Sequence, residues 1–480
     1  MASINKKILC VDLDGTFLKT DMLYESFFYC FFRNPFILLL SLYWLITVGG
    51  GKTLLKSKLS EHFSFSANKI PVNKEIVSLI KKKKDEGYKV YLVSASIEQI
   101  VKKFFLAYQE LFDGYYASNK DTQNLSSKNK ALFLNNLFGK KQYEYVGNSN
   151  DDIEVWNNAS YGYCFTDKYN ILSKINNRYE SIAKEKYFSL LKQIVKQLRC
   201  HQWTKNVLFL IPALACAHVL PFKNYILLLL GILSFSLIAS SVYIINDFID
   251  LDNDRAHEIK KNRPIASGNL SLIYAFFLLV INLIVGIVIS LSISHEYLFY
   301  VLCYLVINIL YSIKFKSILI LDCIILAILY TYRIFLGCVI TDLVVSIWLL
   351  SFSFFLFLSL AFVKRYTELF KYQNKVKQIK GRGYLVSDMS LIQIMSVSSG
   401  FLATLILDLF LNDENIQVNF HNIWLAYACL PVFLYWLCHI YIISSRGKMS
   451  DDPVSFALKD RLSICLGIVF CLFFWAGIYS

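Results

Sequence analysis

The sequence predicts an α/β domain with a helical cap, followed by an all-α polytopic membrane domain of nine transmembrane helices. From about residue 205 onward, apolar runs of about 20 residues recur between short polar loops, and each is long enough to cross ~30 Å of hydrocarbon as a helix. Residues 1–200 instead alternate Lys- and Asp-containing segments with short β-branched runs. This change in composition marks a change of solvent from water to bilayer, and we place the two domains at residues 1–185 and 199–480.

The nine expected spans are followed along the chain by loops that alternate in Lys and Arg content. The spans lie near 205–221, 224–246, 270–292, 296–311, 319–340, 345–363, 390–411, 422–444 and 462–480. Loops 247–269, 312–318, 364–389 and 445–461 together hold 17 Lys and Arg, whereas the other four loops hold only Lys223. Because basic loops stay in the cytoplasm, this pattern predicts a multi-pass protein of the inner (plasma) membrane with residues 1–204 in the cytoplasm.

The distribution of charge argues against a nucleic-acid-binding protein, and the placement of the cysteines argues against a disulfide-rich or zinc-binding one. The formal net charge of +14 does not predict a nucleic-acid partner, because much of the excess sits in the alternate loops between apolar runs. The twelve cysteines include no C-x-x-C pair, and most lie inside apolar runs. They therefore predict neither a disulfide framework nor a zinc site.

The second expected span ends in three carboxylates. Asp247, Asp250 and Asp254 follow a three-then-four spacing, which stacks them on one face of a helix. Like charges at a membrane boundary repel one another unless a cation joins them, and Mg²⁺ with a bound diphosphate is the natural partner. The basic residues that follow are suited to clamp phosphate, and they are Lys260, Lys261 and Arg263. A solvated acidic-then-basic loop is the alternative interpretation.

Further polar residues at or inside the expected spans are candidates for binding substrate. They are Lys205, Asn206, Asn246, Tyr311, Lys316, Asp322, Arg333, Lys364 and Arg365. Asp322 and Arg333 lie within an apolar run, where an ionisable residue is a functional hypothesis by default. Juxtamembrane anchors, or for Arg333 a snorkelling side chain, are the alternatives.

The membrane region resembles a known family. The segment NDFIDLDNDRAHEIKKNRPIASG is similar to the first motif of UbiA-type prenyltransferases, over about residues 199–480. RCHQWTKNVLFLIP, YSIKFKSILILDCI and LAFVKRYTEL resemble the branch that makes polyprenyl-phosphoryl-ribose. The resemblance implies Mg²⁺-dependent transfer of 5-phosphoribose from phosphoribosyl diphosphate to a polyprenyl phosphate, whose phosphate would be placed by basic groups such as Lys205, Arg333, Lys364 and Arg365.

Two rival functions remain open. A conventional prenyltransferase would join an isoprenoid diphosphate to an aromatic or other acceptor, using a second carboxylate pair. Only Asp322 stands at that place, and position 326 is Leu, which disfavours this rival. A transporter or lipid-binding scaffold is disfavoured because the charged residues gather on one membrane face rather than near a midplane.

Residues 7–16 predict a short strand ending in a D-x-D-G-T loop, and later strands also end in polar residues. In a parallel sheet such residues meet at the carboxyl edge of the strands. The ordered set resembles the haloacid dehalogenase superfamily over about residues 6–180, which implies a Rossmann-like fold with a cap at about 22–72. By that resemblance Asp12 is the nucleophile, Asp14 the general acid/base, Ser94 and Lys130 hold the phosphoryl group, and Mg²⁺ binds Asp12, Asp14 and either Asp151 or Asp152.

Two features bear on this domain's role. Asn148 replaces the superfamily's usual Asp, so a degenerate, regulatory domain is the alternative. In the cap, the apolar stretch 27–48 is interrupted by Arg33-Asn34-Pro35 and is too short to span a bilayer. We expect it to lie against the bilayer surface, with a buried helix of a soluble domain as the alternative. The fusion then implies that the phosphatase removes the 5-phosphate from the transferase's lipid product.

Overall fold

The chain divides into two compact units. The computed structural model describes residues 7–46, 51–118, 125–166, 168–182, 188–215, 220–372, 383–418, 420–449 and 452–479. One unit comprises Met1–Arg199 with Tyr243–Ile281, and the other comprises Cys200–Val242 with Asn282–Ser480. The first unit therefore contains the α/β domain together with the end of one long helix, the loop that follows it and the start of the next long helix.

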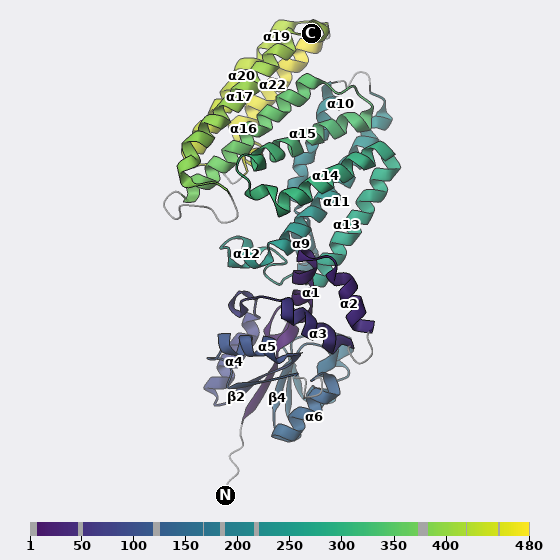
Figure 1. The fold of residues 1–480 in the computed structure, drawn as a ribbon, viewed down its shortest axis with the longest axis vertical. Coiled ribbons are helices and arrows are strands. Elements are labelled where there is room, and N and C mark those ends of the chain that lie inside the picture. Colours follow the sequence, from purple (N-terminus) through teal and green to yellow (C-terminus); the bar gives the residue numbers. More distant parts are fainter. Residues whose placement is uncertain are drawn as a thin grey trace. The chain divides into compact units, whose positions relative to one another are not determined.

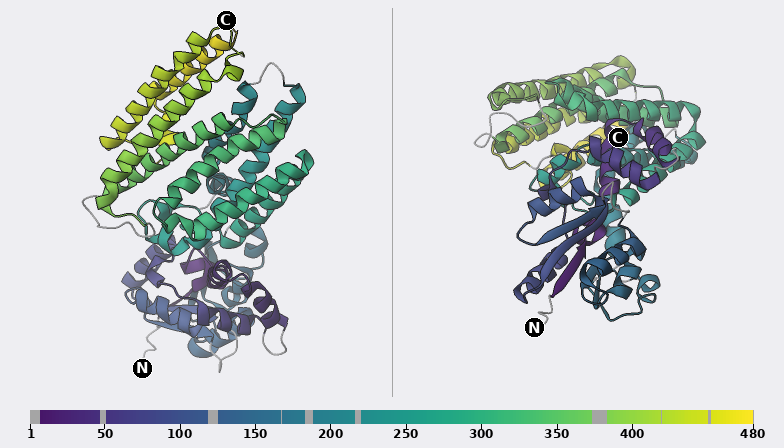
Figure 2. Two further views of the ribbon diagram at one scale, coloured as in Figure 1. Left: turned by 45° about the horizontal axis from the view of Figure 1, so that its top comes forward. Right: turned by 60° about the horizontal axis from the view of Figure 1, so that its bottom comes forward.

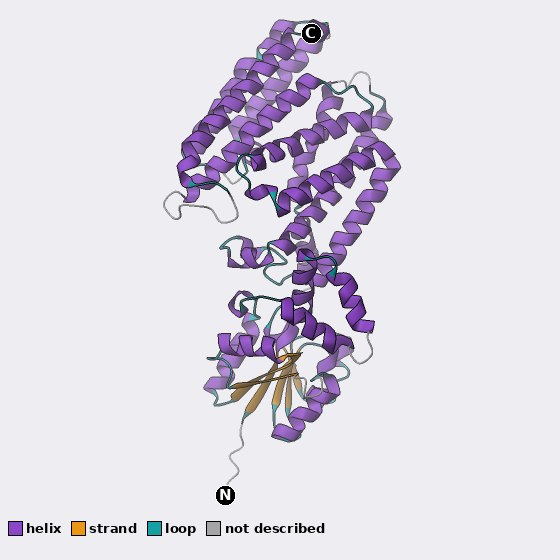
Figure 3. Cartoon of the chain, in the orientation of Figure 1, coloured by secondary structure: helices purple, strands orange, loops and turns teal. Residues whose placement is uncertain are grey.

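The α/β domain is built on a parallel six-stranded sheet (Figure 3). Its strands are β1 (Ile8–Asp12), β2 (Lys89–Ile97), β3 (Gly114–Ser118), β4 (Glu144–Gly147), β5 (Tyr161–Cys164) and β6 (Tyr179–Ser181), in the order β3-β2-β1-β4-β5-β6. The chain moves outward from β1 in both directions, so β1 is the point where the strand order reverses. Ligands of open α/β sheets bind beside the carboxyl ends of the strands at such a point.

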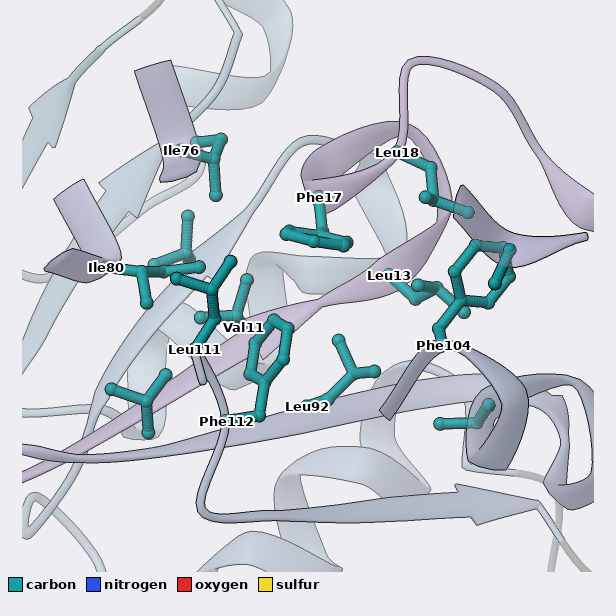
Figure 4. Close-up of a cluster of buried hydrophobic side chains, with 14 of the residues drawn as sticks. Val11, Leu13, Phe17, Leu18, Ile76, Ile80, Leu92, Phe104, Leu111 and Phe112 are labelled. Atoms are coloured by element: carbon teal, nitrogen blue, oxygen red, sulfur yellow. The ribbon is translucent and has the colours of Figure 1, made fainter. Parts of the chain in front are cut away.

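Alternating side chains of β1 face two different hydrophobic clusters. Leu9 and Val11 join one cluster, and Ile8 and Cys10 join the other, as the two-residue period of a strand requires. In Figure 4, Val11, Leu92, Phe104 and side chains of neighbouring helices point toward one another in the first cluster. The helices around the sheet are α4 (Lys74–Asp85), α5 (Glu98–Ala107), α6 (Ser127–Phe138), α7 (Ile153–Asn158) and α8 (Tyr169–Leu172). Burial on both faces explains the nearly continuous apolar sequence of this strand.

Three helices follow the first strand and occupy most of the expected cap. They are α1 (Met22–Arg33), α2 (Ile37–Ile46) and α3 (Gly51–His62). In α2 only Ile37 and Ser41 are buried. Its exposed large apolar side chains are Leu38, Leu39, Leu40, Leu42, Tyr43, Leu45 and Ile46. The alternative of a buried helix is therefore wrong for α2.

Eight helices in the described part of the chain are long and apolar enough to cross a membrane. They comprise α11 (Phe222–Ile249), α13 (Leu272–Ile293), α14 (His295–Ile313), α15 (Leu321–Thr341), α16 (Ile347–Tyr372), α17 (Met389–Asn412), α19 with α20 (Ile423–Tyr427 and Cys429–Ser445) and α22 (Arg461–Tyr479). Within the second unit, α16 and α17 lie side by side, with α20 packed beside α17 (Figures 1 and 2). The chain is thus a multi-pass membrane protein.

The prediction of nine transmembrane helices is wrong for the described residues. Where 205–221 was expected to be one helix, the chain forms a 3₁₀ segment, Cys200–Leu210, and the short helix α10 (Ile211–Ala215), and 216–219 lie outside the described residues. The 3₁₀ segment packs its backbone onto α15, because a Cβ at Gly337 would lie 2.3 Å from the Phe209 carbonyl oxygen. Backbone packing with this partner replaces the regular α-helix that the apolar composition predicts.

The two residues that flank the segment 200–221, Arg199 and Phe222, lie near opposite ends of α11. Arg199 is paired with Asp247 near the end of this 28-residue helix, and residue 221 directly precedes its start at Phe222. A helix of that length measures about 42 Å. The segment therefore connects opposite ends of a membrane-length helix without forming a span-length helix itself in its described part.

Candidate active sites

The end of β1 brings together the residues expected to form a phosphoryl site. The Lys130 ammonium, from the first turn of α6, lies 2.8 Å from Asp12 Oδ1, and the Thr16 hydroxyl donates to Asp12 Oδ2 at 3.1 Å. Asp14 Oδ2 accepts from the Ser96 hydroxyl at 2.7 Å and from the Ser94 hydroxyl at 3.3 Å. Ser96 was missed by sequence reasoning, although the polar alternation at the end of β2 was a usable signal.

Asp152 and Asp151 take different places. Asp152 is buried, accepts from the Tyr145 hydroxyl at 2.6 Å, and lies 3.6 Å from the Lys130 ammonium. Asp151 is exposed, so Asp152 is the residue that joins the cluster. The Asn148 side chain lies against Gly15, where a Cβ would come within 2.3 Å of its amide nitrogen.

The ionisation of Asp12 in this site depends on nearby positive charge. Burial raises the pKa of Asp12 to about 7, with Asp152 and Asp14 acting in the same direction and Lys130 opposing them. A divalent cation would act with Lys130 and favour the ionised carboxylate. No three His, Cys, Asp or Glu side chains among the described residues converge as a metal-binding group. A Mg²⁺ ion here would therefore combine at most two carboxylates with backbone oxygens and water, a shell this ion accepts.

The second candidate site lies at the end of α11 and in the loop after it, within the first unit. Asp247 and Asp254 are both buried and share the Arg263 guanidinium, at 2.9 and 2.5 Å. Arg199 lies 2.5 Å from Asp247 Oδ1, and the Gln197 amide donates to Asp247 Oδ2 at 2.7 Å. Burial raises the pKa of Asp254, and the Arg263 charge opposes that shift. Two buried carboxylates are thus held by two guanidinium groups.

The three carboxylates do not lie on one continuous helix as expected. The long helix α11 ends at Ile249, and Asp250 becomes the N-cap residue of the separate short helix α12 (Leu251–Ala256). The structure joins Asp247 to Asp254 through Arg263, while Lys260 and Lys261 are exposed. Asn246 precedes Asp247 on α11 and is partly buried. The helix break, which the three-then-four spacing does not reveal, allows the loop to fold back over Asp247.

Sequence reasoning also missed the contact that ties the cap to this loop. Glu25 of α1 accepts two hydrogen bonds from Arg255 of α12, at 2.6 and 3.1 Å, and the side chains are only 3% and 2% exposed. The rings of Phe28 and Phe32 also pack on Phe248, at 5.0 and 4.6 Å between centroids. Residues 230 positions apart give no periodic signal, so only the folded chain shows this pair.

We expect Glu25→Gln to destabilise the protein strongly. It would leave the buried Arg255 charge without its anionic partner, which typically costs about 3–5 kcal/mol. The midpoint of thermal unfolding in one detergent should fall by on the order of 5–10 °C. Glu61→Gln is the matched control, because its pair with Lys58 is 50% and 41% exposed and should contribute little. Equal midpoints for the two variants would contradict a stabilising role for the buried pair.

In the second unit, four of the remaining polar candidates form two buried groups. Arg333 is buried and donates to Asn206 Oδ1 at 3.1 Å and to the Tyr304 hydroxyl at 3.3 Å, so the snorkelling alternative is wrong. Arg365 lies 2.8 Å from Asp322, which also accepts from the Tyr384 hydroxyl at 2.5 Å. Asp322 is thus charge-paired inside the helical unit.

Lys205, Lys364, Tyr311 and Lys316 are less enclosed than these two arginines. Lys205 pairs with Asp452 in the last basic loop. Although burial favours the neutral acid, Lys205 and Lys364 lower the pKa of Asp452. Tyr311, Lys316 and Lys364 are partly exposed. The predicted residues of this unit therefore form three groups rather than one.

Comparison with known proteins decides the family of the helical region. Residues 206–379 match the UbiA prenyltransferase family. The protein y4nM of Sinorhizobium fredii, described as uncharacterised, is 34% identical over 466 residues, covering 96% of this chain and 89% of its own. The membrane region of the chain belongs to the UbiA prenyltransferase family. The resemblance identified from the sequence motifs is therefore confirmed at the level of the family.

More distant relatives carry functional names. The nodulation protein NoeC of Azorhizobium caulinodans is 30% identical over 57% of this chain and 92% of its own. A decaprenyl-phosphate phosphoribosyltransferase of Mycobacterium tuberculosis is 25% identical over 59% of this chain and 93% of its own. Among solved structures, a UbiA homologue from Archaeoglobus fulgidus bound to GPP and Mg²⁺ covers 59% of this chain and 98% of its own, with a TM-score of 0.46 and 19% identity.

Proposed function

We propose that this UbiA family member transfers 5-phosphoribose from phosphoribosyl diphosphate to a polyprenyl phosphate with the help of Mg²⁺. The carrying observation is the cluster in which Arg199 and Arg263 hold the buried carboxylates Asp247 and Asp254. The similarity to the mycobacterial decaprenyl-phosphate phosphoribosyltransferase supports this choice of donor and acceptor.

The cluster is suited to bind a metal diphosphate. The carboxylates that hold Mg²⁺ would come from among Asp247, Asp250 and Asp254, one or two at a time, and phosphate oxygens of the substrate would complete the shell of the ion. When bound, the ion neutralises charge on the leaving diphosphate. Arg199 and Arg263 are planar, bidentate donors that can turn from carboxylate to phosphate oxygens. Their charges stabilise the same leaving group.

The acceptor needs little activation. A phosphate monoester of the lipid is already anionic at neutral pH, so positioning and electrostatics carry the step rather than a general base. We assign this positioning to the basic residues of the second unit, among them Lys205, Lys364, Arg333 and Arg365. Asp322 is paired with Arg365 and Tyr384, which favours this role over a second carboxylate site for an isoprenoid diphosphate.

We also propose that the α/β domain, as a haloacid dehalogenase-like phosphatase, removes the 5-phosphate of the product. Asp12 would attack phosphorus, Asp14 would move the proton, and Lys130 with Ser94 and Ser96 would hold the phosphoryl oxygens. The exposed apolar side chains of α2 support a lipid-linked substrate, because such a surface is rarely left to water. This domain shares a unit with the basic loop after α11, which supports a cytoplasmic location under the positive-inside rule.

The test is an assay with purified protein in lipid nanodiscs. Labelled phosphoribosyl diphosphate, Mg²⁺ and polyprenyl phosphate should yield a labelled lipid, and chelation of Mg²⁺ should stop its formation. A parallel reaction supplies an isoprenoid diphosphate and an aromatic acceptor. Product in the second reaction and none in the first would replace our proposal with the conventional prenyltransferase.

A further inference from the structure

Three buried side-chain oxygens, on the two helices that carry Gln197 and Asp247, have no hydrogen-bond partner among the described residues. They belong to Gln197, to Gln193 one turn earlier on α9 (Phe188–Leu198), and to Asn246 on α11. Gln197 is 1% exposed. A buried acceptor without a partner is costly, and native proteins leave few of them. Such atoms therefore point to a ligand that supplies hydrogen-bond donors.

The position of Gln197 ties this oxygen to the proposed diphosphate site. Its amide nitrogen donates to Asp247 Oδ2 at 2.7 Å, and the unpaired oxygen belongs to the same planar amide. The carboxylate therefore fixes the orientation of the amide and leaves the oxygen for another group. Gln193 lies one turn away, and residues four apart share a helix face. Asn246 is the neighbour of Asp247 in sequence.

Because the three amide oxygens are hydrogen-bond acceptors, only some classes of ligand can satisfy them. Phosphate oxygens are themselves acceptors at neutral pH, so a diphosphate cannot satisfy the three amide oxygens. An isoprenoid chain offers no donor. Sugar hydroxyl groups do donate, and in a sugar 1-diphosphate they lie next to the diphosphate. A site built to hydrogen-bond a hydroxyl also rejects analogues that lack it.

We propose that Gln197, with Gln193 and Asn246, forms an acceptor wall that binds the hydroxyl groups of the sugar in a sugar-diphosphate donor. This inference rests on the proposed function and makes α9, the last helix before the membrane region, a determinant of donor specificity. Gln197 selects a hydroxylated donor over an isoprenoid diphosphate, whereas the arginines and Mg²⁺ recognise the diphosphate that both donors share.

The test compares two ligands by calorimetric titration of the full-length protein with Mg²⁺ present. Inorganic diphosphate probes the shared part of the site, and phosphoribosyl diphosphate adds the sugar. Gln197→Met keeps the side-chain length and removes the acceptor together with the amide that donates to Asp247, which keeps its pairs with Arg199 and Arg263. We expect this variant to bind phosphoribosyl diphosphate about 10- to 100-fold more weakly while its affinity for inorganic diphosphate stays within about threefold. Gln99→Met, at an exposed position of α5, is the matched control and should match wild type for both ligands.

The titrations can contradict the proposal in several distinguishable ways. Equal weakening for both ligands would show that Gln197 only holds Asp247, and unchanged binding of both would also overturn the proposal. If Gln197→Met does not fold, Gln193→Met decides, because the same selective loss of about three- to tenfold is expected there. A wild-type protein that prefers an isoprenoid diphosphate to phosphoribosyl diphosphate would instead defeat the proposed function itself.

Discussion

Replacing Asp254 with Asn is expected to lower ribosyl transfer by on the order of 10³-fold. The substitution keeps the size of the side chain but removes a buried anion that would bind Mg²⁺. It also leaves Arg263 with Asp247 as its remaining partner in the cluster, which would draw the guanidinium away from the diphosphate. Asp250→Asn should produce a loss of similar size if Asp250 also binds the metal.

The measurement is the initial rate of labelled lipid formation over a range of Mg²⁺ concentrations. Asp252→Asn is the matched control, because Asp252 lies on the same short helix between the two proposed ligands and should change the rate by no more than about threefold. Expression and the unfolding midpoint must match wild type in all variants. Near-normal turnover of Asp254→Asn at low Mg²⁺ would show that the proposed metal site is wrong.

The second large effect is expected in the α/β domain. Asp12→Asn removes the anionic nucleophile, so the variant should consume phosphoribosyl diphosphate but accumulate the 5-phosphorylated lipid. Wild type should release inorganic phosphate and yield the dephosphorylated ribosyl lipid. Loss of a nucleophile typically lowers a rate by several orders of magnitude. Asp12 and the Asp247 cluster use different elements of the fold, so the two reactions should separate.

Lipid mass spectrometry distinguishes the products, which differ by one phosphate group. Asp151→Asn provides a second comparison, because Asp151 is exposed and outside the cluster, and this variant should still dephosphorylate the lipid. If wild type and Asp12→Asn give the same phosphorylated lipid, the domain is not a phosphatase. In that case Asn148 would be the first residue to test, by substitution to Asp.

The sequence by itself determined the two-part organisation, seven of the expected spans closely and the family of the membrane region. Long apolar runs indicate directly which part of the chain lies in the bilayer. Motif residues such as Asp12 and Asp247 lie at or near the end of the strand or helix that positions them. The same composition overpredicted a helix at 205–221, because hydrophobicity does not reveal that Phe209 packs its backbone on Gly337.

Only the tertiary structure decided which polar side chains meet. Asp152 rather than Asp151 joins Lys130. Gln197 at the end of α9 and Arg199 just after that helix both reach Asp247, and Glu25 holds Arg255 across 230 residues. These pairings depend on the direction of single side chains at helix ends and loops. Periodicity describes faces of regular elements, so it carries no information on contacts between irregular segments that lie far apart in the chain.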